Sequence, residues 1–245
     1  MVWEPRTYRQ VSSAGALVSF TVVRGETDLQ IGALRDLSAE ALAAVDAVRA
    51  GLEHYVAAHP RFLESYVPVD VDDDAPEVVG AMARAGAAAG TGPMAAVAGA
   101  IAERVARALE PLSAEVIVEN GGDTFMMGTR ARRVLLVAGD SPLSGRVALA
   151  VEGATLPIAI CTSSGKVGHS VSLGSAHSAT VVAPDGALAD AVATALGNRV
   201  HGPDDIERAL AWACAVPGVT GAVVIAGDRI GALGEIRLEP VNPQV

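Results

Sequence analysis

The sequence predicts an α+β protein, and we expect residues 1–245 to form a single domain. Helix-like patterns gather in residues 38–109 and strand-like patterns in residues 115–161, whereas a doubly wound parallel sheet would alternate the two. The apolar share is 51%, with only 3% aromatic residues, so small side chains must pack helices closely on a sheet. A chain of 245 residues buries enough surface to fold without disulfides.

The first half combines two strands with three helices. β-branched and apolar residues at 8–23 and 29–34 predict strands on either side of a turn at residues 24–28. Helical spacing of apolar residues begins at Ser38 and ends near His59-Pro60. Residues 76–89 and 93–109 predict two Ala-rich helices, the second with Pro93 in its first turn. Small residues of the second helix allow very close approach to whatever it packs on: Ala95, Ala98, Gly99 and Ala102.

The second half is rich in strands. Gly-, Asp- and Pro-containing turn signals separate short apolar segments. Strands are predicted at residues 115–119, 124–127, 133–138, 146–151, 158–161, 178–182, 219–225 and 235–238, and helices at residues 187–196 and 204–215. We find no internal repeat and no low-complexity linker.

Charge and composition exclude several classes of partner. A net charge of -10 argues against nucleic acids and anionic membrane surfaces, both of which require basic patches. Residues 85–102 are uncharged but mostly Ala and Gly, which favours a buried helix pair over a membrane span. Two lone cysteines and an N-terminus without a secretory pattern indicate a cytoplasmic protein. The sequence is compatible with a homodimer.

A first candidate site follows the strand that ends at Glu119. The adjacent Gly121 and Gly122 expose backbone N–H groups and tolerate positive φ, so a ligand can approach the main chain, while Asn120 and Asp123 add polar side chains. A plain hairpin turn is the alternative interpretation, since Asn-Gly is a strong hairpin signal.

A second candidate is the polar segment after the strand at 158–161. Its hydroxyls, glycine and lysine suit a phosphate or carboxylate, although the spaced glycines of a nucleotide P-loop are missing. The residues are Thr162, Ser163, Ser164, Gly165 and Lys166. The preceding Cys161 has no identifiable base, which favours an inert buried thiol over a nucleophile.

Two further candidates lie downstream. His169 lies in a segment too polar for a core and suits proton transfer or ligand orientation, although an ordinary loop histidine fits as well. His177 leads into an apolar strand and is expected to be structural.

Asp190 and Thr194 are four residues apart, on one helical face among alanines. Their hard oxygens suit Mg²⁺ or Ca²⁺ better than Zn²⁺, although a mid-helix Thr often bonds back to its own chain.

Together and in this order, these segments resemble the ApbE superfamily, best known for FAD:protein FMN transferases. The motifs that carry the resemblance are Asn120-Gly121-Gly122-Asp123, Thr162-Ser163-Ser164-Gly165, His169, Thr180-Val181-Val182-Ala183-Pro184 and Ala189-Asp190-Ala191-Val192-Ala193-Thr194-Ala195. The resemblance implies a T-fold-like α+β architecture, Mg²⁺ on Asp190 and Thr194, and FAD, FMN or a related heterocycle between the glycine bend and the Thr-Ser loop.

The chain also departs from the transferases. The family's His-x-x-x-Pro-x-Thr-Gly loop reads here His169-Ser170-Val171-Ser172-Leu173-Gly174, without Pro and without Thr-Gly. Gly90-Thr91-Gly92-Pro93 replaces the usual Lys-Gly helix start. The sequence therefore resembles most closely the shorter cytosolic ApbE-like branch.

These features support Mg²⁺-assisted phosphoryl or nucleotidyl transfer, or hydrolysis, on a flavin-, nucleotide- or pterin-like small molecule, with His169 as the catalytic residue. A non-catalytic flavin or heterocycle carrier of the same fold is the alternative. A hydrolase that uses the hydroxyls of Thr162, Ser163 and Ser164 is a third reading, without a Gly-x-Ser-x-Gly motif to support it.

Overall fold

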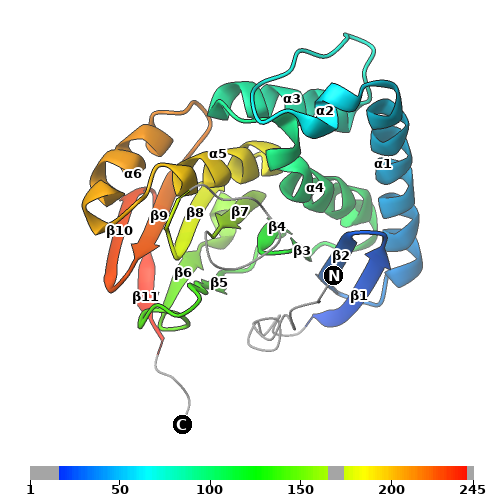
Figure 1. Cartoon of the computed structure of the whole chain (residues 1–245). Helices are drawn as coiled ribbons and strands as arrows, with labels where there is room; N and C mark the ends of the chain where they lie inside the picture. Colours follow the sequence, from blue (N-terminus) through cyan, green and yellow to red (C-terminus); the bar gives the residue numbers. More distant parts are fainter. Residues whose placement is uncertain (1–16, 165–173, 242–245) are drawn as a thin grey trace.

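The chain forms two antiparallel sheets and a layer of helices. A computed structural model describes residues 17–164 and 174–241. Its larger sheet has eight strands in the order β1-β2-β3-β4-β7-β8-β9-β10, and its smaller sheet has the order β11-β6-β5 (Figure 1). This mixed architecture confirms the α+β class that the sequence predicts.

The strands of the larger sheet are β1 (Val18–Arg24), β2 (Thr27–Ala33), β3 (Val116–Asn120), β4 (Asp123–Met127), β7 (Ile158–Ser163), β8 (Ser178–Ala183), β9 (Gly221–Ala226) and β10 (Arg229–Gly234). Those of the smaller sheet are β5 (Arg132–Leu135), β6 (Val147–Val151) and β11 (Leu238–Pro240). The helices are α1 (Ser38–Ala58), α2 (Pro60–Glu64), α3 (Glu77–Ala89), α4 (Val97–Leu109), α5 (Gly186–Asn198) and α6 (Ile206–Cys214).

The helices cover one face of the large sheet, as Figure 1 shows. α4 packs on β3 and β4, α5 packs on β7 and β8, and α3 lies against both helices. Strand alternation explains this layer, because Phe125 and Met127 of β4 point into the helical core while Met126 points to the opposite face. Ala and Gly on α4 and α5 let both helices approach the sheet and each other closely.

The small sheet covers part of the opposite face. Its Leu149 and Val151 pack with Ile158 and Ile160 of β7 and with Val182 of β8 in a second apolar cluster. The central strands are therefore buried on both faces, which accounts for their nearly continuous apolar sequences.

The observed elements differ from the predicted ones in several places: α2 was not predicted, and β11 begins at Leu238, where the predicted strand at 235–238 ends. β10 was not predicted, because its sequence, RIGALG, is glycine-rich and mostly exposed at a sheet edge. β7 continues through Thr162 and Ser163, which we expected in a loop, because β8 pairs with both residues. A 3₁₀ turn at Pro93–Ala96 precedes α4, which starts at Val97.

Among the described helices, none is long and apolar enough to cross a membrane alone. One pair, Glu77–Ala89 with Pro93–Leu112, meets the length and composition test only jointly and is bent by 104°. These helices bury Ala- and Gly-rich faces in the core, as predicted for a buried helix pair.

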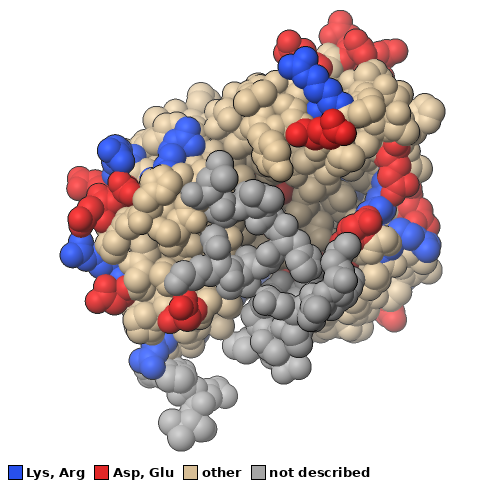
Figure 2. Space-filling view, in the orientation of Figure 1, with Lys and Arg blue, Asp and Glu red and all other residues tan. Residues whose placement is uncertain are grey.

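Charged side chains on the face in Figure 2 lie toward its periphery. Acidic and basic groups alternate over α1 on one side and over α6 and β10 on the other, and acidic groups lie at the top over the segment between α2 and α3. Among the described residues visible in this view, basic groups are accompanied by acidic ones rather than gathered in a patch.

Candidate functional site

The glycine bend is a two-residue hairpin between β3 and β4. Asn120 pairs with Asp123, and the intervening Gly121 and Gly122 have φ of 67° and 104°, a conformation that glycine adopts without strain. The Gly122 N–H donates to Glu119 Oε1 at 2.7 Å. The hairpin interpretation is confirmed, and it leaves Asn120 and Asp123 buried beneath the helices.

Asn120 ties this hairpin to the start of α4. Its Nδ2 donates to the carbonyl oxygen of Ala98 at 3.1 Å. Since Asn120 is only 7% exposed, this bond is shielded from water. This bond fixes the hairpin against the first turn of α4.

Asp123 lies on the same side, at the centre of the sheet. Its Oδ1 accepts from the Thr162 N–H at 3.2 Å, which links β4 to the end of β7. Burial raises the pKa of Asp123 well above its ordinary value of 3.8, and the negative charge of Asp190 raises that pKa further. Asp123 and Asp190 thus share one low-dielectric space.

Asp190 reaches this space from α5. Its Oδ2 accepts from the Gly99 N–H, at the start of α4, at 2.9 Å. Burial raises the pKa of Asp190 to about 7, although the N–H groups of Gly99 and Ala98 favour the ionised form. Burial and the N–H groups at the start of α4 therefore act on the pKa of Asp190 in opposite directions.

The oxygen atoms of this cluster suit a hard divalent cation. Thr194 follows Asp190 by one helical turn and is partly exposed. Within residues 17–164 and 174–241, no Arg or His side chain forms an ion pair with Asp123 or Asp190, and no set of three His, Cys, Asp or Glu side chains is arranged around a metal position. Two carboxyls with a hydroxyl and water as further ligands fit Mg²⁺, which binds proteins through few carboxylates.

The segment after β7 divides between the two faces of the sheet. The Thr162 hydroxyl lies 2.9 Å from that of Thr180, on the face away from the helices, so only its N–H reaches Asp123. Ser163 faces α5 instead, and its buried Oγ has no hydrogen-bond partner among the described residues. The Ser164 hydroxyl donates to the His177 carbonyl at 2.8 Å. Gly165, Lys166 and His169 lie outside the described residues.

The two remaining side chains match their expected structural roles. His177 Nδ1 accepts from the Gly227 N–H at 3.1 Å, and its Nε2 lies 3.2 Å from Asp140 Oδ1. Cys161 is 1% exposed, and burial together with the nearby Asp123 and Asp190 raises the pKa of its thiol well above 9.0. A neutral buried thiol of this kind is a poor nucleophile.

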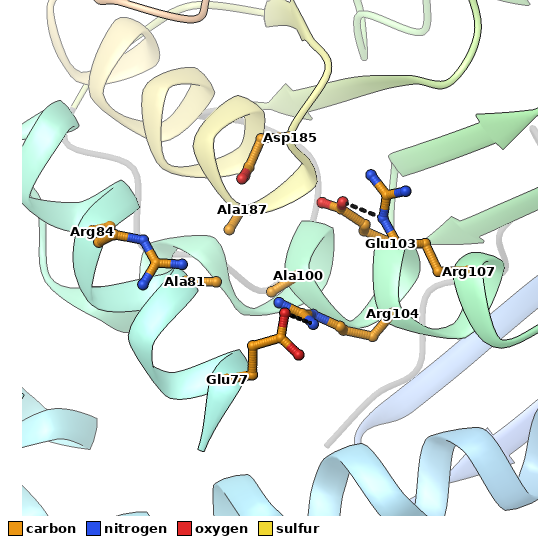
Figure 3. A pocket seen from close by; sticks show the side chains of 9 residues that line it. All are labelled: Glu77, Ala81, Arg84, Ala100, Glu103, Arg104, Arg107, Asp185 and Ala187. Carbon is orange, nitrogen blue, oxygen red and sulfur yellow. Dashed lines mark hydrogen bonds and ion pairs between the residues drawn. The ribbon is translucent and has the colours of Figure 1, made fainter. Parts of the chain in front are cut away.

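A surface cavity of about 280 Å³ lies elsewhere, between α3, α4 and the start of α5 (Figure 3). It contains Arg84, Arg104 and Arg107 but none of the residues that the sequence singles out. We place the candidate site at Asp123 and Asp190 because buried carboxyls with raised pKa values mark functional sites more specifically than a charged surface hollow does.

Sequence reasoning missed the main-chain groups that hold this cluster. The Gly99 N–H and the Ala98 carbonyl bond to residues 91 and 22 positions away, respectively. The closely packing small residues of α4 were recognised, but a local pattern does not reveal which partner they approach.

The fold is that of ApbE-type proteins. The structure is similar to "flavinyl transferase ApbE" from Pseudomonas stutzeri, with a TM-score of 0.57 and 16% identity over 89% of this chain and 94% of that one. It is also similar to "Flavin Transferase ApbE" from Vibrio cholerae, with a TM-score of 0.59 and 16% identity over 89% and 96% of the two chains. At such identities the shared property is the fold.

Sequence comparison gives the particular family. A UPF0280 protein of Methanopyrus kandleri is 46% identical over 225 residues, covering 89% of this chain and 91% of the relative. A UPF0280 protein of Methanocaldococcus jannaschii is 43% identical over 193 residues, covering 77% and 78%. A family model described as "AbpE bacteria" matches residues 9–230, and the chain belongs to this ApbE-like family.

Proposed function

We propose that the chain is a Mg²⁺-dependent enzyme that acts on a flavin-, nucleotide- or pterin-like small molecule, by phosphoryl or nucleotidyl transfer or by hydrolysis. One observation carries the proposal: the carboxyl of Asp190, which is partly buried, lies close enough to the buried Asp123 for its negative charge to raise the cost of ionising Asp123. A divalent cation between such carboxyls would offset their repulsion. The structural similarity to solved flavin transferases supports the ligand class.

Each residue of the site has a distinct role in this proposal. Asp190 and Thr194 hold the cation, and Asp123 adds a second negative charge beside it. The bound Mg²⁺ would neutralise phosphate charge as it develops during transfer. The glycine bend at Gly121 and Gly122 lets the ligand approach the main chain and, together with Thr162 to Lys166, positions it, and His169 moves a proton or orients the reacting group.

The proposal is tested by incubating the protein with FAD and Mg²⁺ and measuring released AMP by mass spectrometry. Asp190→Ala should abolish Mg²⁺-dependent ligand binding and AMP release, whereas Asp228→Ala, in the exposed turn after β9, should change neither. Unchanged binding and turnover in Asp190→Ala would exclude this mechanism. Flavin retained by the wild type without any product would instead favour a carrier.

A chemical probe offers a second test. Lys166 is the only lysine in the sequence, so an amine-reactive reagent has one side-chain target. With Mg²⁺ and FAD present, we expect slower labelling of Lys166, measured by peptide mass spectrometry, while labelling of the N-terminal amine serves as the internal control. Equal labelling with and without FAD would remove Lys166 from the ligand site.

A further inference from the structure

Helices α4 and α5 carry related sequences. Residues 99–109 read GAIAERVARAL and residues 186–196 read GALADAVATAL, with identical residues at seven of eleven positions. Equivalent side chains are equally buried: Val105 and Val192 are both 0% exposed, as are Leu109 and Leu196. Glu103 and Asp190 occupy equivalent positions in the two sequences.

The two helices exchange carboxylates at their N-terminal ends. Asp190 of α5 accepts from the Gly99 N–H of α4 at 2.9 Å, and Glu103 of α4 accepts from the Gly186 N–H of α5 at 2.7 Å. In each helix the carboxylate follows the glycine by four residues, and it satisfies an N–H that the first turn of the other helix leaves unpaired. The helices are therefore joined by two equivalent bonds.

Direct backbone contact makes this crossing rigid. A Cβ atom on Gly99 would lie 2.2 Å from the Gly186 carbonyl oxygen, and one on Gly186 would lie 2.5 Å from the Gly99 carbonyl oxygen. Neither glycine has a side chain that could absorb a displacement. A change at one bond must therefore move the backbone that makes the other.

The two ends of the crossing differ one turn further along. Arg107 occupies the position equivalent to Thr194, and its Nε donates to Glu103 Oε1 at 2.7 Å, as drawn in Figure 3. Its guanidinium carbon also lies 5.3 Å from the centre of the Phe125 ring. Glu103 thus has a fixed cation supplied by its own helix, whereas Asp190 has a hydroxyl in that place.

We infer that Glu103 is a positioning residue for Asp190, acting through the backbone contact between Gly99 and Gly186. Its bond to Gly186 fixes the first turn of α5, and the contact at the crossing then fixes the distance from Gly99 to the Asp190 carboxylate. The consequence for Mg²⁺ rests on the proposed function, because it assumes that Asp190 binds the ion. The positioning itself is independent of metal.

Two substitutions separate hydrogen bonding from simple packing. Glu103→Ala removes the acceptor, and Glu103→Gln keeps an acceptor oxygen for Gly186. Glu77→Gln is the control, because Glu77 lines the same cavity but is 79% exposed and, within the part of the chain that the structure describes, forms an ion pair only with Arg104. Mg²⁺ affinity is measured by titration calorimetry, and the Gly99 amide is followed by ¹H–¹⁵N NMR without metal.

We expect Glu103→Ala to weaken Mg²⁺ binding about tenfold, the typical effect of losing a partner that orients a metal ligand. The Gly99 amide resonance should move in that variant and return toward its wild-type position in Glu103→Gln. An unchanged Gly99 resonance in Glu103→Ala would overturn the inference. Should this variant not fold, Glu103→Asp, whose shorter side chain retracts the acceptor, is judged by the same resonance.

The two proposals fail in different ways. If the wild type binds no Mg²⁺ while Glu103→Ala still moves the Gly99 resonance, the proposed metal function fails and the positioning role stands. If Mg²⁺ binds equally well to wild type and Glu103→Ala and the Gly99 resonance is unchanged, the positioning role fails and the metal site stands.

Discussion

Individual carboxyl groups are where the chemistry of this chain is most sensitive to pH. Asp190 has a pKa of about 7, so it exchanges a proton in the range where most enzymes work. A metal ion has to displace that proton before the carboxylate can bind it. Mg²⁺ binding and proton release are therefore expected to be coupled.

We expect Mg²⁺ affinity to fall as the pH decreases from 8 to 6, by roughly tenfold per unit below pH 7 if one proton is displaced. Calorimetric titrations in buffers of different ionisation enthalpy measure both the affinity and the proton release. Asp190→Asn should lose most of the affinity and all of the coupling. An affinity that is independent of pH in this range would show that Asp190 does not bind the ion.

Stability without metal should depend on the same group. The pKa of Asp190 is raised in the folded state, so its contribution is fully present below the unfolded value of 3.8 and is lost as pH rises through about 7. Between pH 5 and pH 8 the free energy of unfolding of the wild type should fall because Asp190 ionises. In Asp190→Asn this fall should be smaller by about 2 kcal/mol, a value that allows for the partial exposure of Asp190. Urea unfolding at both pH values measures this.

Asp123 also has a raised pKa and should preserve part of the pH dependence in that variant. Identical pH dependence in wild type and Asp190→Asn would contradict the assignment. A difference in stability between wild type and Asp190→Asn that changes only below pH 5 would contradict it as well, because ordinary surface carboxyls titrate there.

The two thiols should differ in reactivity. Cys161 is 1% exposed beside two carboxyls, whereas Cys214 is only partly buried near the end of α6. In native protein at pH 8, iodoacetamide should modify Cys214 and leave Cys161 unmodified, while both should react in denaturant. Peptide mass spectrometry distinguishes the two sites. Rapid labelling of Cys161 in the native protein would favour the alternative hypothesis that Cys161 is a nucleophile.

At the scale of elements, replacing a helical glycine distinguishes the effect of close packing from that of helix propensity. In Gly99→Ala the new methyl group would meet the Gly186 carbonyl, so the free energy of unfolding should fall by about 3 kcal/mol or more. Gly51→Ala, within α1, is the matched control. The nearest atom to its new Cβ would be in Pro76 at 3.6 Å, an ordinary van der Waals distance. That variant should be unchanged or more stable by about 0.5–1 kcal/mol. Equal effects would exclude a special contact at Gly99.

Sequence reasoning located most helices because their signals are local. Asp185 caps α5 by accepting from the Leu188 N–H at 2.8 Å, and Pro93 precedes α4, so both helix starts are recognisable without the fold. β10 has no comparable signal, because its glycines and exposed edge position remove the apolar alternation. Ser163 was misplaced for the opposite reason, since a polar residue can occupy a buried strand whose backbone is paired.

The candidate site was only partly predictable. Asp190 and Asp123 were named from their local motifs, but their proximity depends on α5 crossing the sheet above β4. The exchanged bonds join residues 91 and 83 positions apart, which no local pattern specifies. The repeated Gly-x-x-x-acid spacing was nevertheless visible in the printed sequence and would have pointed to Glu103.

At the scale of the whole molecule, the large sheet is shared by two cores. Leu149 lies in the cluster beneath the small sheet, while Val105 lies in the helical core on the other face. Because β4, β7 and β8 contribute to both cores, we expect Leu149→Ala to cost about 2–4 kcal/mol and to leave a single unfolding transition. Far-UV circular dichroism and Trp fluorescence should then give the same midpoint. Separated midpoints would show that the small sheet unfolds independently.

The glycine crossing of α4 and α5 also bears on how such a protein can diversify. The glycines of the two helices meet backbone to backbone, and the carboxylates of Glu103 and Asp190 brace that contact, so it places no demand on the side chains two turns away. One helix there carries an arginine and the other a threonine, on frames that are otherwise nearly identical. Selection can therefore change the side chains at that position of one helix while the other helix preserves the geometry of the crossing.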